Sequence, residues 1–420
     1  MRLGCNECGS SAASLDAPAC ERCGGLLAFE LDGNPCDASE IRVRSALRRS
    51  SDDPLDRSGV WRFRELLPEI PSAHVVTLRE NDVPLYDARL GADYARAERV
   101  AYLHLGANPT GSFKDAGMTV AISRARARGA AVAVCASTGN TAASMAAYAA
   151  RAGMPAVVVV PSDGISAAKM AQTLDYGATV AAVEGDFDRA LRLVRALEGT
   201  RVALLNSVNP YRIEGQKCAA FALLALREWR APVWLVLPGG NLGNASAFGK
   251  GFREAHALGL IERIPRLAVV QAAGAAPFAR AFRDGAPLVP VTASTAASAI
   301  NIGAPASWKK ALQEVRRSDG LVTEVSDDDI ADARAVIGRE GIGCEPASAA
   351  ALAGLRRLRA ENAIAADDDV VLVLTGHVLK DSAYAANYHA SPARLANGVV
   401  RLAGGDALAA LVERMGGVHA

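Results

Sequence analysis

The sequence predicts an α/β protein built on parallel sheets, because short apolar runs alternate with alanine-rich helical runs from about residue 100 onward. A run such as Ala156–Val160, enclosed by two prolines, is typical of a strand that is buried on both faces. Thr141–Ala152 has the length and composition of a helix. A second observation is the concentration of cysteines near the N-terminus, which predicts a separate small unit there.

Composition narrows the class of protein. The chain has 420 residues, of which 50% are hydrophobic and 22% charged, which fits a globular protein of two or three domains. The formal net charge of +1 gives no basic excess for binding nucleic acid or a membrane surface. The apolar runs are strand-length, well below the ~20 residues of a membrane span. Met1–Cys5 lacks the apolar core of a signal peptide, so a cytoplasmic enzyme is expected.

The predicted elements follow one another in a regular order. Strands are expected at Ala131–Ala136, Ala156–Val160, Thr179–Val183, Val202–Leu205, Val233–Leu237, Leu267–Gln271, Leu321–Val325 and Val370–Leu374. Helices are expected at Thr141–Ala152, Ser166–Tyr176, Phe187–Leu197, Gln216–Arg227, Ser307–Arg317, Asp327–Arg339 and Ala347–Ala360, and in the tail after Ser391. Residues 37–60 are charged and irregular, which predicts a linker with a solvated face.

Two cysteine pairs mark residues 1–35 as a small unit. Cys5 and Cys8 form one Cys-x2-Cys pair and Cys20 and Cys23 form the other, each followed by glycine. Four thiolates at this spacing suit a closed, tetrahedral and therefore structural zinc site. The alternatives are a ribbon without metal and an oxidised cysteine pair.

The stretch Asn108–Asp115 places a single lysine, Lys114, in a turn-rich and mostly uncharged setting. A lysine held away from solvent there has a lowered pKa, and its neutral amine can form a Schiff base with a carbonyl cofactor such as pyridoxal phosphate. The alternative is a surface lysine at the start of a helix.

Polar loops follow several predicted strands, where a parallel sheet places its binding sites. In Ser137–Thr141, hydroxyls, an amide and a helix N-terminus converge, which suits a carboxylate; the alternative is an ordinary N-cap. Pro238–Asn244 contains three glycines before a helix, which favours a phosphate cradle over a flexible turn. Thr375, after the last strand, offers a neutral hydroxyl that would leave a pyridine nitrogen largely unprotonated.

Two further polar residues lie in apolar surroundings. Arg212, in the segment Asn206–Arg212, can hold a phosphate or carboxylate with two parallel hydrogen bonds, or form a surface ion pair. Glu345 can cap the following helix or line a pocket.

Together these stretches resemble a known motif set. The matching motifs, in the family's order, are Asn108–Asp115, Ser137–Thr141, Asn206–Lys217, Pro238–Asn244, Ala304–Lys309, Glu345–Ser348 and Thr375–His377. The set resembles that of threonine synthases, which are fold type II pyridoxal-phosphate enzymes related in fold to the tryptophan synthase β subunit. The four-cysteine unit is similar to the zinc-ribbon-like start of many bacterial and archaeal members.

The resemblance implies two parallel-sheet α/β domains plus the zinc ribbon. The ribbon would be residues 1–35, and the large domain would comprise 36–118, with the lysine, and 208–420, with the phosphate loop. Residues 119–207 would form a small mobile domain that closes over the substrate. Dimers are common in the family, so a homodimer is also compatible with the resemblance.

The resemblance also implies a role for each motif residue. Lys114 would be the Schiff-base lysine and proton shuttle, Asn140 would contact the cofactor's 3′-oxygen, and Thr375 would face its pyridine nitrogen. The cofactor phosphate would lie in the loop formed by Gly240, Asn241, Leu242, Gly243 and Asn244. The substrate carboxylate would be held by Ser137, Thr138 and Thr141, and the substrate phosphate by Ser207 and Arg212, with Asn241 as a further candidate.

The activity implied is the conversion of O-phospho-L-homoserine and water to L-threonine and phosphate. The sequence departs from the family pattern at Asn81–Val83, at Ala116, where an arginine is usual, and at Val378, where a glycine is usual. One alternative is therefore replacement or elimination on another phosphorylated amino acid, as in cysteate synthase, which uses O-phosphoserine and sulfite. Another is a binding protein that has lost turnover.

Overall fold

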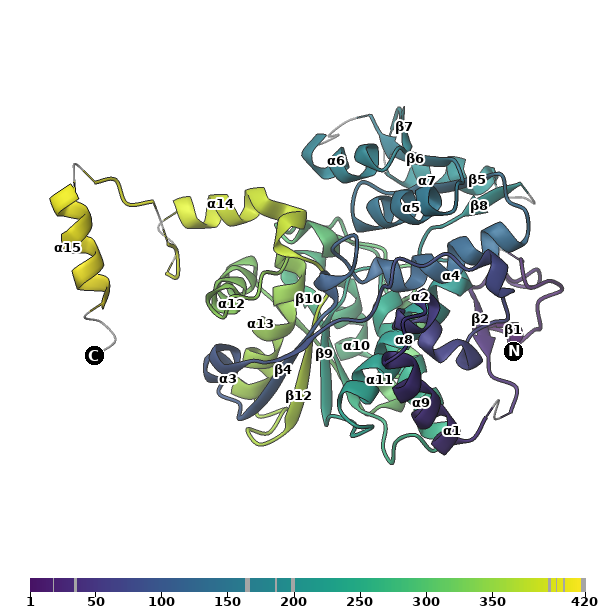
Figure 1. The fold of residues 1–420 in the computed structure, drawn as a ribbon, viewed down its shortest axis with the longest axis horizontal. Coiled ribbons are helices and arrows are strands. Elements are labelled where there is room, and N and C mark those ends of the chain that lie inside the picture. The colour runs from purple at the N-terminus through teal and green to yellow at the C-terminus, as the bar shows by residue number, and fades with distance from the viewer. Residues whose placement is uncertain are drawn as a thin grey trace. The chain divides into compact units, whose positions relative to one another are not determined.

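The computed structural model describes residues 1–17, 19–33, 36–162, 167–185, 187–197, 201–391, 394–397, 399–402 and 405–416. These residues form two units, Met1–Asp381 and Ser382–Ala420. The first unit holds two parallel sheets and a cysteine-bearing hairpin (Figure 1). The second contains α14 (Ser382–Ala390) and α15 (Gly405–Gly416).

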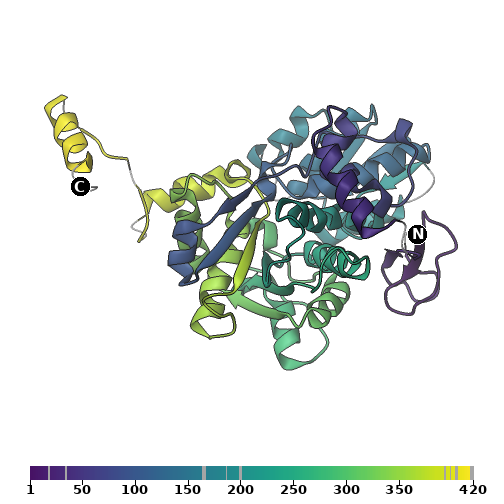
Figure 2. The same cartoon turned by 60° about the horizontal axis from the view of Figure 1, so that its bottom comes forward.

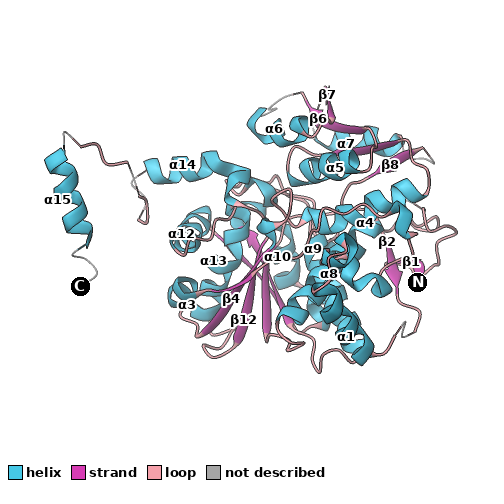
Figure 3. Cartoon of the chain, in the orientation of Figure 1, coloured by secondary structure: helices cyan, strands magenta, loops and turns pink. Residues whose placement is uncertain are grey.

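The larger sheet has six strands in the order β11-β10-β9-β12-β4-β3. Their bounds are β3 Leu85–Asp87, β4 Arg99–His104, β9 Trp234–Pro238, β10 Arg266–Ala272, β11 Leu321–Val325 and β12 Asp369–Leu374. Every pairing is parallel except that of β3, which runs antiparallel at the edge. The central strands are buried along almost their whole length, because helices cover both faces of the sheet (Figure 3).

The smaller sheet has four parallel strands in the order β7-β6-β5-β8. Their bounds are β5 Val132–Ala136, β6 Ala156–Pro161, β7 Thr179–Val183 and β8 Val202–Leu204. Alternate residues of β5 enter different cores: Ala133 and Cys135 join the core that includes α5, whereas Val134 and Ala136 pack with α7. The period of two along the strand thus places a helix on each face.

The remaining helices connect and cover these strands. They are α1 Ala38–Arg49, α2 Pro54–Arg57, α3 Arg89–Ala95, α4 Lys114–Ala127, α5 Asn140–Arg151, α6 Ala167–Asp175, α7 Phe187–Ala196, α8 Pro210–Leu226, α9 Gly243–Ala257, α10 Pro277–Asp284, α11 Trp308–Arg317, α12 Asp327–Arg339 and α13 Pro346–Ala360. The predicted α/β fold with parallel sheets is confirmed.

The N-terminal unit is a two-stranded antiparallel hairpin of β1 (Arg2–Cys5) and β2 (Leu27–Glu30). It forms a small lobe beside the sheets (Figure 2). The side chains of Leu27 and Phe29 are each 1% exposed, because this face of the hairpin is covered by the helices of the larger sheet.

Helices α4 and α8 cross at unusually close range. A Cβ added at Gly215 would lie 1.9 Å from the carbonyl oxygen of Ala116, and one at Gly117 would lie 2.7 Å from that of Arg212. Only glycine at both positions lets the two backbones touch in this way. Ala116, one of the departures from the family pattern, is 2% exposed and lies at this crossing.

Several boundaries differ from the sequence-based prediction. The expected linker at 37–60 contains α1, which buries Ile41 and Ser45. Helix α8 begins at Pro210, not Gln216, because Asn209 caps the amide of Tyr211 and proline occupies the first turn. Strands β3 and β4 were not predicted. The predicted start of one helix, Ser166, lies outside the described residues.

The predicted domain limits remain a prediction. All four strands of the smaller sheet fall within residues 119–207, and α4 runs across the limit at residue 118. In the part of the chain that the structure describes, no helix has the length and apolar character that crossing a membrane requires.

We predict that Gly215→Ala lowers the free energy of unfolding by about 2 kcal/mol or more, because the added methyl overlaps the backbone of α4. The matched control is Gly338→Ala in α12, where an added Cβ meets nothing within 4 Å; it should be neutral or stabilising by up to about 1 kcal/mol. Urea unfolding of both variants measures the difference. Equal midpoints would contradict the close crossing.

Candidate active site

Lys114 is the first residue of α4 and follows a tightly fixed turn. The carboxylate of Asp115 accepts hydrogen bonds from the backbone amide of Thr110 at 2.7 Å, from its hydroxyl at 2.6 Å, and from the hydroxyl of Ser144 in α5 at 2.6 Å. Burial raises the pKa of Asp115 to about 6, although these three donors oppose the shift. The turn that presents Lys114 is therefore held from both its own loop and α5.

The same turn pairs with the segment that follows β12. The amide of Phe113 donates to the carbonyl of Thr375 at 2.9 Å, and the amide of His377 donates to the carbonyl of Gly111 at 2.9 Å. These two backbone bonds bring Lys114 to the carboxyl end of β12, which is where a parallel sheet places its binding site.

The surroundings of Lys114 favour its neutral form. Burial is the largest effect and the positive charge of Arg212 the next; together they lower the pKa of the Lys114 amine to about 7, against the opposing charge of Glu345. The Nζ atom lies 4.0 Å from the centre of the Phe113 ring. A large fraction of the amine is thus unprotonated near neutral pH, which favours the Schiff-base interpretation over an ordinary surface lysine.

Asn140 and Thr375 meet at a buried carboxyl group. The Nδ2 of Asn140 donates to Glu345 at 3.0 Å, and the hydroxyl of Thr375 donates to the same carboxylate at 3.4 Å and lies 2.9 Å from the hydroxyl of Ser348. Burial raises the pKa of Glu345 despite these donors. The two residues predicted to contact the cofactor ring are therefore linked to each other through Glu345, whose charge also acts on Lys114.

The start of α5 exposes backbone donors. Its N-cap is Gly139, and no described side chain caps the first turn; the hydroxyl of Ser137 accepts only from the amide of Gly139, at 3.2 Å. The alternative of an ordinary Ser or Thr cap is therefore wrong. Thr138 is exposed and Thr141 half-buried, so the loop offers free amides and hydroxyls to an anion.

The glycine loop forms a second donor cradle between β9 and α9. Leu242 is the N-cap of α9 with φ at +63°, and no described side chain caps this helix either. The Nδ2 of Asn244 is buried without a hydrogen-bond partner among the described residues. A Cβ on Gly240 would lie 3.2 Å from the carbonyl oxygen of Ala299, so the loop is open only to a small residue here. Unsatisfied amides at a helix start fit a phosphate.

Arg212 provides a third group of donors. Its side chain is 1% exposed, and its Nη1 donates to the carbonyl of Leu205 at 3.1 Å. Its Nε and Nη2 have no hydrogen-bond partner within the described part of the chain. A buried guanidinium with two free N–H groups is suited to a bidentate anion, which rules out the surface ion pair.

Ser207 and Asn241 connect the Arg212 segment to the glycine loop. The Nδ2 of Asn241 donates to the hydroxyl of Ser207, and its Oδ1 accepts from the amide of Ala306 at 2.6 Å. The predicted substrate-phosphate residues therefore lie beside the predicted cofactor-phosphate loop. The asparagines of the same segment are structural: Asn206 exchanges two hydrogen bonds with the backbone of Ala136.

The residues present fit pyridoxal phosphate. Lys114 supplies a neutral amine for the aldehyde, the uncapped start of α9 with the orphaned Asn244 fits the phosphate, and Asn140 and Thr375 offer neutral partners for the ring. The chemistry of these donors matches each functional group of the cofactor.

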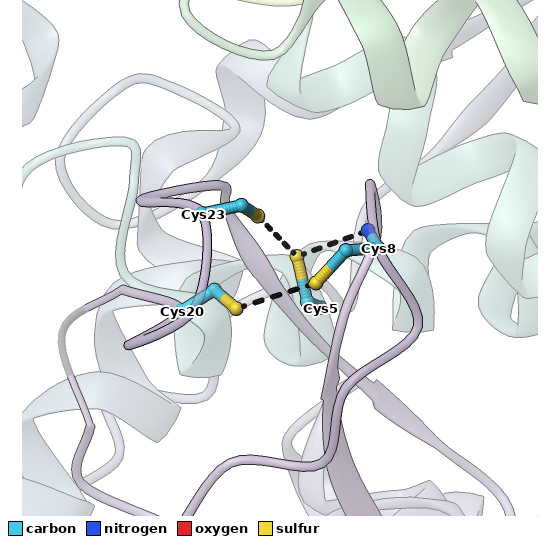
Figure 4. A group of neighbouring side chains, drawn as sticks. All are labelled: Cys5, Cys8, Cys20 and Cys23. Atoms are coloured by element: carbon cyan, nitrogen blue, oxygen red, sulfur yellow. Dashed lines mark hydrogen bonds between the residues drawn. The ribbon is translucent and has the colours of Figure 1, made fainter.

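The four N-terminal cysteines converge as predicted. Their sulfur atoms all lie within 4.8 Å of one another (Figure 4), and the Cys5–Cys23 and Cys8–Cys20 separations are 3.5 Å. The amide of Glu7 also points at the sulfur of Cys5, at 3.3 Å. The cluster fits a tetrahedral zinc site, and an S–S separation of 3.5 Å is too long for a disulfide, whose bond is ~2.05 Å.

Comparison with known proteins agrees with this geometry. Residues 76–376 match the family described as pyridoxal-phosphate dependent enzymes. The chain belongs to this family, and pyridoxal phosphate is its cofactor.

Its sequence relatives are more specific. The chain is 40% identical over 384 residues to the threonine synthase of Methanosarcina acetivorans, covering 90% of this chain and 92% of the relative. It is 47% identical over 326 residues to that of Synechocystis, covering 76% and 82%. By these matches the chain is a member of the threonine synthase family, and the resemblance expected from the motifs is confirmed.

Solved structures show the same fold at lower identity. Threonine synthase from Escherichia coli superposes with a TM-score of 0.70 at 20% identity, covering 96% of this chain and 92% of that one. Threonine deaminase isoform 2 from Solanum lycopersicum gives 0.62 at 18% identity, covering 83% and 93%.

For Glu345 the sequence left open a helix cap or a pocket-lining role, and the structure excludes the side-chain cap. Its side chain makes no cap bond to α13, although it is the N-cap residue, and turns instead toward Asn140 and Thr375. The available signal was an acidic residue before proline at a helix start in an apolar region.

Val378, one of the departures from the family pattern, packs on Gly343, where a Cβ would lie 2.5 Å from the valine.

We expect the rate at which added pyridoxal phosphate becomes attached to Lys114 to rise with pH and to level off above about pH 7, because the reactive amine is neutral above its pKa. In Arg212→Met the midpoint should move to higher pH, since a charge that lowers the lysine pKa is removed. The visible absorbance of the attached cofactor measures the rate. Arg227→Met, at the other end of α8, is the matched control and should leave the midpoint unchanged; an unmoved midpoint in Arg212→Met would refute the coupling.

Proposed function

We propose that this protein is a threonine synthase that converts O-phospho-L-homoserine and water to L-threonine and phosphate. The observation that carries the proposal is the pair of separate anion-binding arrangements beside one neutral amine. The glycine loop is suited to the cofactor phosphate, and Arg212 has two free buried donors for a second phosphate. A substrate that is itself phosphorylated accounts for the second arrangement, and threonine synthases are the chain's sequence relatives.

Each group of residues then has a task. The uncapped start of α5 at Ser137–Thr141 binds the substrate carboxylate and thereby orients the amino acid. Arg212 and Ser207, with Asn241, bind the substrate phosphate and hold it as it leaves. Pyridoxal phosphate, when bound, supplies the electron sink for the carbon acid. Asn140 and Thr375 hold the ring in a fixed orientation.

Lys114 moves the protons. Its pKa of about 7 lets the neutral amine accept the proton from the substrate Cα and the ammonium return a proton later. Arg212 helps to keep the amine neutral, so the residue that binds substrate also tunes the base. When an anion fills the phosphate site, it offsets the positive charge of Arg212 and raises the proton affinity of the Lys114 amine. The bound substrate therefore favours transfer of the Cα proton to Lys114.

We also propose a metal, a domain movement, a cellular location and an oligomeric state for this protein. The four cysteines hold structural zinc, and the segment 119–207 closes over the substrate to exclude water until the last step. A cytoplasmic location and a homodimer are also proposed, and sedimentation of the purified protein tests the latter.

Turnover is tested with two substrates in parallel. The protein with bound cofactor should release phosphate and form threonine from O-phospho-L-homoserine, and should form no cysteate from O-phospho-L-serine with sulfite. Lys114→Ala should abolish both phosphate release and the visible cofactor band. Threonine absent from the first reaction, with the band intact, would reject the proposal in favour of another phosphorylated amino acid.

Arg212→Met should raise the KM for O-phospho-L-homoserine about 10- to 100-fold, because loss of charge-assisted hydrogen bonds to an anion removes roughly 1.5–3 kcal/mol. The affinity for pyridoxal phosphate should change less than threefold, since the glycine loop remains. Steady-state kinetics and cofactor titration measure the two effects. Equal losses in both would contradict the division between the two phosphate sites.

A further inference from the structure

The four-cysteine unit lies against the helix that carries Arg212. Tyr211, the residue before Arg212, is 4% exposed, and its ring packs edge-on against Phe29 of β2 with ring centres 4.8 Å apart. The Tyr211 hydroxyl donates to the carbonyl of Leu15 at 3.3 Å. The first turn of α8 is thus held by two parts of the unit.

The same part of the unit also holds α4. Asp16 accepts two hydrogen bonds from the guanidinium of Arg124, at 2.9 and 2.6 Å, and this guanidinium lies 5.7 Å from the centre of the Tyr211 ring. Leu15 and Asp16 lie between the two cysteine pairs in sequence. Their position therefore depends on whether the pairs are drawn together.

A second set of contacts reaches the glycine loop through α11. Lys309 pairs with Glu7, which lies between Cys5 and Cys8, and Gln313 donates to the carbonyl of Asn6 at 3.5 Å. At the start of the same helix, the amide of Ser307 donates to the carbonyl of Asn241 at 3.2 Å. The side chain of Asn241 is in turn hydrogen-bonded to Ser207.

Two buried lysines fix the edge of the hairpin. Lys310 of α11 donates to the carbonyl of Leu27, and Lys250 of α9 donates to that of Phe29. Burial lowers the pKa of Lys310 to about 8, and the charge of Lys250 acts in the same direction. Because a buried amine without acceptors is costly, displacement of β2 would force Lys310 to move, whereas Lys250 would keep its bond to Glu214.

We propose that the four-cysteine unit, with its metal, positions the substrate-phosphate site: it holds Arg212 through Tyr211 on one side and Asn241 through α11 on the other. The metal draws together the loops that carry Glu7 and Leu15, and these loops set the affinity of Arg212 for the phosphate. The unit is therefore a positioning element for substrate recognition rather than an independent structural appendage. The inference rests on the proposed role of Arg212.

The test measures binding of inorganic phosphate to the cofactor-loaded protein by calorimetry, with zinc bound and after removal of zinc by a chelator. Removal should weaken phosphate binding about tenfold, as is usual for contacting, coupled groups, while the visible cofactor band is retained. In Tyr211→Leu with zinc still bound, phosphate binding should also weaken, but by less than on zinc removal, because the connection through α11 remains. Removal of zinc from Tyr211→Leu should then add less than the tenfold loss expected for the unsubstituted protein, because the connection through Tyr211 is already broken.

The matched control is Tyr94→Leu, which changes a half-buried tyrosine that, like Tyr211, has a guanidinium over its ring, that of Arg356 at 4.5 Å. It should leave both phosphate binding and its dependence on zinc unchanged.

Steady-state kinetics provide a second test: zinc removal should raise KM for the phosphorylated substrate and leave kcat within twofold. If the metal-free protein aggregates, Tyr211→Leu and Asp16→Asn, both measured with zinc bound, still test the proposal.

Phosphate binding that is unchanged by zinc removal would overturn the proposal. So would a loss of phosphate affinity in zinc-free Tyr211→Leu that equals the product of the losses caused by zinc removal alone and by the substitution alone. If instead the proposed role of Arg212 as the substrate-phosphate residue is wrong, Arg212→Met would leave phosphate binding unaffected. If Arg212→Met abolishes phosphate binding while zinc removal and Tyr211→Leu do not affect it, the phosphate site stands and only the positioning role is wrong.

Discussion

The close crossing of α4 and α8 is the constraint on which the site depends. Gly117 and Gly215 each lie three residues after a functional residue, Lys114 in one helix and Arg212 in the other. One helical turn therefore separates the backbone contact from the amine on one side and from the guanidinium on the other. With backbone atoms this close at the crossing, the packing of the helices fixes the distance between the backbone positions that carry Lys114 and Arg212.

The proximity of these two basic side chains contributes to the electrostatics of the site. Burial and then the guanidinium lower the pKa of the Lys114 amine to about 7, and burial raises the pKa of the neighbouring Glu345 carboxyl group. Among the described residues, the unpaired donors of Arg212 and Asn244 and two helix starts without side-chain caps give this region a surplus of N–H groups. Anions would satisfy these donors, and the phosphorylated cofactor and the phosphorylated amino acid that we propose as substrate are both anions.

Much of this arrangement could be predicted from the sequence because the relevant signals are local. The buried strands, the cysteine pairs, the glycine loop and Lys114 are each recognisable from a few consecutive residues. Features that depend on helix caps, on small buried faces or on contacts between distant residues were not predicted. The start of α8 was placed too late, because the cap at Asn209 and the proline after it were not recognised as the beginning of a helix. Helix α1 was mistaken for a linker, since its buried face is small. The contact of Glu345 with Asn140 joins residues 205 positions apart and has no sequence signature.

The central claim is that two separate phosphate sites lie beside Lys114, and a crystal structure of the cofactor-loaded protein grown with inorganic phosphate tests it most directly. We expect the cofactor phosphate at the start of α9 and a second phosphate bonded to the Nε and Nη2 of Arg212 at roughly 2.7–2.9 Å. A single phosphate position in the glycine loop, with those two nitrogens of Arg212 paired to a protein carboxylate or carbonyl, would contradict it.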